Sequence, residues 1–231
     1  MLKDSFVKAL KRVAPKFVYQ TYSAPAVQVE KLVSFVKKIG NQPSMVLDVG
    51  AGECRYEKFL EELGEVIPMD FKLYKGVKIV GDAYRLPFRD QCFDVVCLFS
   101  VLEHLHSPWL ALKECKRVLV RGGLALITAP QYWHTHAFPT DYYRFTRYGL
   151  EHLCKDAGFR ILNCWSTGGP FLVLFHVLEL NLRLLSFSPK ALLYNTLGFC
   201  LDKLDGILFK HEDKRQFSDS VGWALIAQKI T

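Results

Sequence analysis

The residues best suited to chemistry are a carboxylate and a glycine pair at the end of an apolar segment. Asp48, Gly50 and Gly52 lie in VLDVGAGECRY (46–56), where a buried-strand pattern gives way to a turn. Glycines at such a corner let the backbone approach a ligand closely, as in nucleotide sites. A carboxylate in an apolar strand is costly to bury unless it orients the loop or meets a cation. A glycine pair alone also fits an ordinary strand–turn–helix corner.

Two further carboxylates end later apolar segments. Asp70 closes EVIPMD, about 20 residues after the glycines, where a carboxylate can accept both hydroxyls of a ribose. Asp82 and Ala83 follow VKIVG (77–81), where a carboxylate could meet the exocyclic amine of a base. Taken singly, either aspartate fits a turn or a helix cap. Three carboxylates in order at successive strand ends favour a nucleotide-type site.

A histidine-rich group follows two of the predicted strands. His104 and His136 are candidates for a catalytic base or for acceptor contact, and Asp141 and Arg144 for binding polar groups. For each histidine, a hydrogen-bonded structural role stays open. A metal site built from the histidines and Asp141 is an alternative, but without a metal-type spacing we predict no metal. The complete histidine group is His104, His106, His134 and His136.

Alternating strands and helices must position these residues. The expected strands are rich in Val, Ile and Leu without polar alternation, which indicates burial on both faces and a parallel sheet with helices on each side. In such sheets ligands bind beyond the carboxyl ends of the strands. The predicted strands are 45–49, 65–70, 77–81, 93–99, 124–129, 159–165 and 221–229, and the predicted helices are 26–39, 54–63, 108–119 and one capped by Thr146.

Segments outside this alternation divide the chain. Residues 1–40 are predicted to form N-terminal helices, the first of them basic and amphipathic over residues 2–13, and 41–231 the main domain. Within that domain, 168–215 forms an apolar helical insertion before the last strand. Its apolar surface fits core packing or a homodimer through 170–210, with a lipid-facing or peripheral membrane role as the alternative.

Composition limits the class of protein and its partners. The chain has 231 residues, a formal charge of +7 and a pI of about 9.0, which suits an anionic partner. Its seven cysteines are scattered without a C-x-x-C pair, which indicates free thiols in a reducing compartment, so we expect a cytoplasmic protein, with membrane-peripheral placement as a variant. We expect neither a transmembrane helix nor a signal peptide. Basic residues are spread out, so nucleic acid is not the expected partner.

Five segments in order resemble the class I S-adenosylmethionine-dependent methyltransferases, closest to the small-molecule branch that contains the quinone-biosynthesis enzymes. The resemblance covers about residues 44–166. It implies an α/β, Rossmann-like, doubly wound seven-stranded sheet whose last strand is antiparallel, with the helical insertion between strands 6 and 7. The segments are 46–55, Asp70, GDAYRLPF (81–88), FDVVCLFSVLEHL (93–105) and KRVLVRGGLALITAP (116–130).

The resemblance also implies roles for individual residues. Asp48, Gly50 and Gly52 would hold the methionine part of S-adenosylmethionine and Asp70 its ribose. Asp82 and Ala83 would hold the adenine, and Phe99 and Ser100 the other side of the cofactor. One departure is Cys54, which stands where the family usually has a third glycine.

Other classes fit less well. A dinucleotide site of the G-x-G-x-x-G type would require glycine where Arg55 stands. The segment FSVLEHL lacks the Asn/Asp-Pro-Pro-aromatic run typical of methyltransferases that act on base amino groups. We therefore predict an S-adenosylmethionine-dependent methyltransferase that acts on a small-molecule, lipid or glycan-linked acceptor. The alternative is a methyltransferase-like binding protein whose apolar insertion docks a partner or a membrane.

Overall fold

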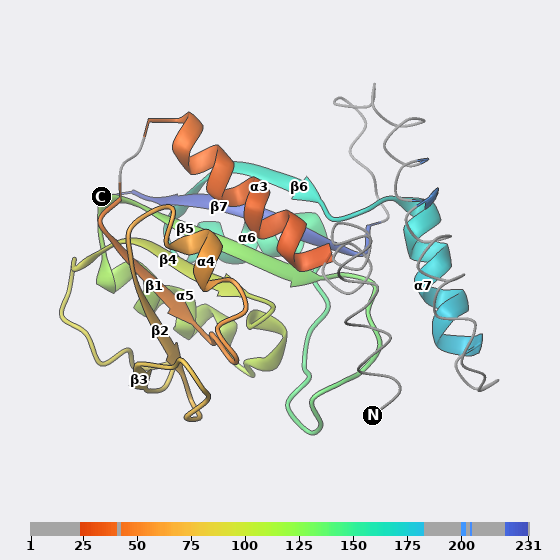
Figure 1. The fold of residues 1–231 in the computed structure, drawn as a ribbon, viewed down its shortest axis with the longest axis horizontal. Helices are drawn as coiled ribbons and strands as arrows, with labels where there is room; N and C mark the ends of the chain where they lie inside the picture. The colour runs from red at the N-terminus through yellow and green to blue at the C-terminus, as the bar shows by residue number, and fades with distance from the viewer. Residues whose placement is uncertain (1–23, 41–42, 183–199, 202–203, 205–219, 231) are drawn as a thin grey trace. The chain divides into compact units, whose positions relative to one another are not determined.

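The computed structural model describes residues 24–40, 43–182, 200–201, 204 and 220–230 (Figure 1). The predicted basic helix 2–13 and most of the insertion 168–215 lie outside these residues. The chain divides into two compact units. The described residues of one unit are 28–40, 43–131, 135–165 and 222–230, and this unit contains the sheet. The described residues of the other are 24–27, 132–134, 166–182, 200–201, 204 and 220–221.

The first unit is built on one seven-stranded sheet with the order β3-β2-β1-β4-β5-β7-β6. β1 pairs in parallel with β2 and with β4, and β7 runs antiparallel to β5, so the predicted mixed sheet is confirmed. The order reverses at β1, whose neighbours β2 and β4 lie on opposite sides of it. The strands are β1 (Met45–Val49), β2 (Glu65–Asp70), β3 (Ile79–Val80), β4 (Phe93–Phe99), β5 (Leu119–Pro130), β6 (Phe159–Ser166) and β7 (Gly222–Lys229).

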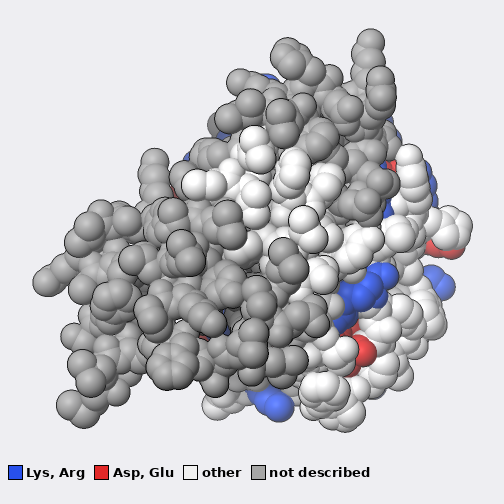
Figure 2. Space-filling model, turned by 90° about the vertical axis from the view of Figure 1, so that its right-hand side faces the viewer, with Lys and Arg blue, Asp and Glu red and all other residues white. Residues whose placement is uncertain are grey.

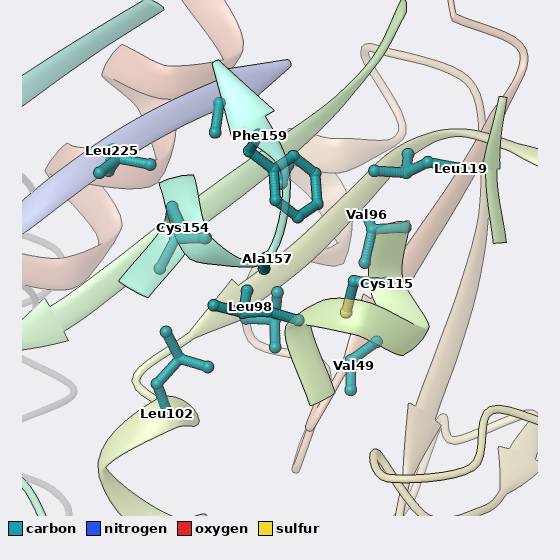
Figure 3. Packing of buried hydrophobic residues seen from close by; sticks show 14 of the residues in the cluster. Val49, Val96, Leu98, Leu102, Cys115, Leu119, Cys154, Ala157, Phe159 and Leu225 are labelled. Atoms are coloured by element: carbon teal, nitrogen blue, oxygen red, sulfur yellow. The ribbon is translucent and has the colours of Figure 1, made fainter. Parts of the chain in front are cut away.

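Alternate residues of the strands pack into two apolar layers, one on each face. On one face, α3 (Ala24–Lys38) and α4 (Glu57–Leu60) cover Val46, Val95 and Leu126. On the other, α5 (Pro108–Val118) and α6 (Arg147–Asp156) cover the alternate strand positions. Figure 3 shows this second layer, where Leu98 of β4 and Leu225 of β7 lie among Cys115, Cys154 and Phe159. Burial on both faces explains the unbroken apolar runs in the sequence.

Two predicted elements are shorter than expected. The predicted helix 54–63 was wrong in extent, because turns occupy the residues up to Tyr56 and only α4 is helical. Cys54 has a φ of +54°, a left-handed conformation that a right-handed helix cannot include. The predicted strand 77–81 reduces to β3, which pairs with β2 through two residues, Ile79 and Val80.

Helix α6 begins as predicted. Thr146 is its N-cap, and the Thr146 hydroxyl accepts a hydrogen bond from Gly149 N. The chain preceding this helix packs close to the end of β4, because Tyr142 N and Tyr143 N both donate to the carbonyl of Glu103. The loop 135–145 is therefore fixed against the 3₁₀ turn η1 (Leu102–His104), which follows β4.

The second unit contains helix α7 (Pro170–Leu182), within the predicted insertion. Leu172 and Phe175 of α7 are buried against Val221, whereas Leu174 and Val177 are exposed. Among the described residues, no helix combines the length and apolar character needed to cross a bilayer. On the face shown in Figure 2, the described surface is mostly uncharged, with Lys and Arg beside Asp and Glu rather than in one continuous basic stripe.

Candidate functional site

The turn after β1 is tied to the end of β2. Gly50 N and Ala51 N both donate to the carbonyl of Met69, at 2.8 and 3.0 Å. Gly52 N donates to Asp70 Oδ2 at 2.9 Å. β1 and β2 are neighbours in the sheet, so these bonds fix the turn at the carboxyl edge where parallel sheets bind ligands.

The two glycines are needed for different reasons. Gly50 has a φ of +74°, and a Cβ there would lie 2.5 Å from Val101 Cγ2, so close packing requires glycine. Gly52 has a φ of +53°, but no atom lies within 4 Å of the position a Cβ would take. The space beside Gly52 is therefore open, as a site for a closely approaching ligand requires. Gly50 is explained by the fold, and Gly52 combines a backbone requirement with room for a ligand.

Asp70 is the most constrained carboxylate of the turn. It is 4% exposed. Its Oδ2 accepts from Gly52 N and its Oδ1 from Lys72 N, at 2.9 and 3.1 Å. Because each carboxylate oxygen has two lone-pair directions, one acceptor site remains on each oxygen. Two acceptors on one carboxylate suit a vicinal diol, the arrangement expected for a ribose.

Asp48 lies within β1 and is 2% exposed. Burial, together with the charges of Asp70 and Glu57, raises the pKa of Asp48 to about 7. Part of the Asp48 population therefore carries a proton at neutral pH. A cation bound beside it would stabilise the ionised form, so this position suits the positively charged end of a ligand.

The segment after β3 forms a braced turn. Asp82 is exposed, and its Oδ1 accepts from Tyr84 N at 2.9 Å, which is the turn role that the sequence left open. Ala83 packs on the buried core. Arg117 of α5 holds the rest of this segment, donating to the carbonyls of Leu86 and Phe88. The predicted adenine contacts of Asp82 and Ala83 stay predictions.

The end of β4 carries local strain at Ser100. Ser100 has a φ of +54°, and its N donates to the backbone carbonyl and to Oγ1 of Thr128, at 3.0 and 3.1 Å. Non-glycine residues rarely adopt this conformation, and those that do are concentrated at functional sites. Phe99 is buried, with its ring in edge contact with Tyr56 at 5.3 Å between centroids. The predicted cofactor contacts of Phe99 and Ser100 stay predictions.

His104 and His136 lie together, as the sequence predicted for residues that follow neighbouring strands. Their ring centroids are 4.7 Å apart in an edge-on contact. His104 Nδ1 lies 2.7 Å from the carbonyl oxygen of Thr140, which can only accept, so Nδ1 carries the proton. Burial is the main cause that lowers the pKa of His104, which keeps the ring neutral. The unprotonated atom of neutral His104 is therefore Nε2.

Asp141 and Arg144 form a tight pair. Arg144 donates through both terminal nitrogens to the two oxygens of Asp141, at 2.7 and 2.8 Å, and the Asp141 side chain is 2% exposed. These bonds are the main reason that the pKa of Asp141 lies below its usual range. Asp141 Oδ2 also accepts from His136 N at 2.8 Å. The geometry favours a positioning role for this pair, and the predicted contact with an acceptor stays a prediction.

Glu103 is the functional candidate that residue spacing did not select. Its side chain is 1% exposed, and burial raises the pKa of its carboxyl to about 8. Its Oε1 lies 4.0 Å from His104 Nε2. The signal in the sequence was a charged residue directly before a histidine in an otherwise apolar stretch, FSVLEHL.

The remaining two histidines have separate surroundings. His106 Nδ1 is hydrogen-bonded to the hydroxyl of Tyr84, a contact between distant segments that the sequence did not indicate. His134 belongs to the other unit, where its ring stacks on Trp133.

Comparisons with known proteins agree with this fold. Residues 47–127 match a family model described as a methyltransferase domain. A demethylmenaquinone methyltransferase of Thermobifida fusca is 34% identical over 123 residues, 46% of this chain and 50% of that protein. An uncharacterized methyltransferase of Schizosaccharomyces pombe is 33% identical over 105 residues, 45% of this chain and 35% of that protein. The chain thus spans about a third to a half of the length of these curated relatives.

A solved structure matches over a longer range. The 1,6-didemethyltoxoflavin-N1-methyltransferase of Burkholderia thailandensis, solved with 1,6-didemethyltoxoflavin and S-adenosylhomocysteine, aligns with a TM-score of 0.58 and 16% identity. The alignment covers 100% of this chain and 88% of that one. At this identity the match concerns the fold.

The sheet order and the match of residues 47–127 show that the chain contains a methyltransferase-like domain with the fold of the solved methyltransferases. In sequence this region is similar to quinone methyltransferases.

Proposed function

We propose that this chain is an enzyme that binds S-adenosylmethionine at the carboxyl edge of β1, β2 and β4 and transfers its methyl group to a small-molecule acceptor. The observation that carries the proposal is the buried carboxylate of Asp70, which accepts from Gly52 N on one oxygen and from Lys72 N on the other, while the Cβ position of Gly52 is open. That arrangement offers two acceptors to a ribose without reorganisation of the turn.

The surrounding residues fit the rest of the cofactor. Asp48 lies next to this turn, and its raised pKa means that a cationic partner, such as the amino group of the methionine part, would stabilise its charge. Gly52 leaves room for that part to approach the backbone. Asp82 and Ala83 would border the adenine, with Phe99 and Ser100 on the other side.

S-adenosylmethionine supplies a methyl group on a sulfonium sulfur, and its transfer is an in-line displacement. The main task of the protein is therefore to align the acceptor with the methyl group and to exclude water. A hydroxyl acceptor would also give up a proton. Nε2 of neutral His104 is an atom that could take this proton, and His136 would contact the acceptor beside it.

The acceptor in this proposal is a small organic molecule. The quinone and toxoflavin methyltransferases among the similar proteins support a small organic acceptor, and a lipid or glycan-linked acceptor extends the same proposal. The exposed Leu174 and Val177 of α7 are compatible with a lipid or with a homodimer through 170–210. Cytoplasmic and membrane-peripheral placement stay predictions.

The test is calorimetric titration of the full chain with S-adenosylmethionine and S-adenosylhomocysteine, with NADH as the control ligand. The proposal predicts one site for each sulfur compound and none for NADH, because Arg55 stands where a dinucleotide loop needs glycine. Absence of binding at millimolar concentrations of both sulfur compounds would refute it.

A further inference from the structure

A group of side chains beyond the end of β4 has the chemistry of a metal site. One ligand atom from each of Glu103, His104 and His136 lies within 4.8 Å of the other two. Two imidazoles and one carboxylate are the protein ligands of several catalytic zinc and iron sites. We propose that these three residues bind a divalent first-row transition-metal ion of the Zn²⁺ type.

Glu103 supplies the first argument. Within the part of the chain that the structure describes, its Oε2 is buried and has no hydrogen-bond partner. Its Oε1 lies 4.0 Å from His104 Nε2, and one carboxylate oxygen lies within 4.8 Å of a ring nitrogen of His136. Buried polar atoms are nearly always satisfied, and one that is not requires an explanation. A cation bound by both oxygens of this carboxylate would provide that partner.

His104 is oriented as a ligand. Its Nδ1–H donates to the carbonyl of Thr140 at 2.7 Å, which fixes the tautomer and the ring direction. Metal-ligating histidines almost always donate their second ring nitrogen to a carbonyl or carboxylate in this way. The lone pair of His104 is therefore on Nε2, on the side of Glu103.

His136 is held by a similar outer contact. Its Nδ1 lies 3.4 Å from Asp141 Oδ2, and the same oxygen accepts from His136 N at 2.8 Å. Arg144 fixes Asp141 through two hydrogen bonds. A carboxylate beside a histidine, itself held by another group, is the typical support of a ligand histidine. Asp141 therefore positions His136.

The distances allow closure around an ion. Bonds of about 2.0–2.2 Å to nitrogen and oxygen put tetrahedral ligands about 3.3 Å apart. The observed separations require side-chain shifts of about 1 Å, within reach of rotamer adjustment in Glu103 and His136. Three protein ligands leave at least one coordination position open to water or to an oxygen of a ligand.

This metal site deepens the proposed function, and it rests on that proposal for the identity of the oxygen-bearing ligand, which would be the methyl acceptor. It begins four residues after Phe99, which ends β4, so an oxygen-bearing acceptor at the open coordination position would lie at the carboxyl edge of the sheet. A histidine nitrogen bound to a metal cannot accept a proton at the same time. A metal role for His104 therefore replaces its role as a base.

To test the site, the chelator-treated full chain is titrated with Co²⁺ while visible absorption is monitored. A second titration with Zn²⁺ is measured by calorimetry. We expect one equivalent to bind. Glu103→Gln, His104→Gln and His136→Gln should each weaken binding at least tenfold. His152→Gln is the matched control, because His152 lies on α6 with a side chain that is 76% exposed, and it should leave the affinity unchanged.

Two results would overturn the site. One is the absence of stoichiometric binding by the full chain. The other is binding that all three substitutions leave unchanged, which would indicate the free thiols. If a variant fails to fold, X-ray absorption of the Zn²⁺-loaded wild type decides, because two imidazoles are expected and a sulfur-dominated shell contradicts the proposal. S-adenosylhomocysteine binding, measured separately, separates failure of this site from failure of the cofactor site.

Discussion

Substitution of Asp70 by Asn removes one charge while the shape of the side chain is retained. The amide keeps one oxygen, so one of the two bonds from Gly52 N and Lys72 N is lost, and we expect the free energy of unfolding to fall by about 1 kcal/mol. A ribose diol would lose a charge-assisted acceptor, worth about 1.5–3 kcal/mol. The affinity for S-adenosylhomocysteine should therefore fall by about 10- to 150-fold.

Isothermal titration of wild type and Asp70→Asn with S-adenosylhomocysteine measures this loss directly. Asp156→Asn is the control, since Asp156 lies exposed on α6 and should keep wild-type affinity. Urea unfolding of each protein establishes that the variants are folded. A dissociation constant within twofold of wild type in folded Asp70→Asn would refute the ribose assignment.

Further predictions concern the same edge of the sheet. Because Asp48 has a pKa of about 7, affinity for S-adenosylhomocysteine should fall by up to about tenfold per pH unit below pH 7 and level off above it, measured by titration at several pH values. Cys54→Gly should raise the free energy of unfolding by about 1 kcal/mol in urea, because Cys54 has a φ of +54°. Arg117→Lys should weaken cofactor affinity severalfold by calorimetry, because lysine cannot reproduce the bonds to Leu86 and Phe88.

Each of these predictions has a contradicting result. If the pH dependence of S-adenosylhomocysteine affinity persists in Asp48→Asn, a group other than Asp48 causes it. Without ligand, the same raised pKa should lower the free energy of unfolding as pH rises from about 4 to about 7, because the unfolded chain releases this proton first. Loss of stability in Cys54→Gly would mean that the packing of the Cys54 side chain in the space beside Gly76 outweighs backbone strain. Unchanged affinity in Arg117→Lys would mean that the hydrogen bonds from Arg117 to Leu86 and Phe88 do not contribute to cofactor binding.

The central strands could be predicted from sequence because burial on both faces requires an uninterrupted run of apolar residues. β1, β2 and β4 have the predicted bounds, since each apolar run is bordered by polar or turn residues. The helix predicted at 54–63 failed because the left-handed backbone of Cys54 is set by the turn around it, not by residue type. A two-residue strand such as β3 depends on its partner rather than on its own sequence.

Asp48 and Asp70 could be selected from sequence as candidate site residues because each is a charged residue at the end of an apolar strand. The meeting of His104 and His136 followed from the order of parallel strands. By contrast, the bond from His104 to the carbonyl of Thr140 depends on the path of a loop, and a backbone carbonyl leaves no mark in the sequence. The isolation of the Glu103 carboxylate depends on burial that only the packed loop produces.

The most direct test of the proposed cofactor site is a crystal structure of this chain with S-adenosylhomocysteine. We expect both ribose hydroxyls within hydrogen-bond distance of the Asp70 carboxylate, with the amino-acid end of the ligand beside Gly52 and Asp48. A nucleoside bound elsewhere, or one whose ribose makes no contact with Asp70, would contradict it.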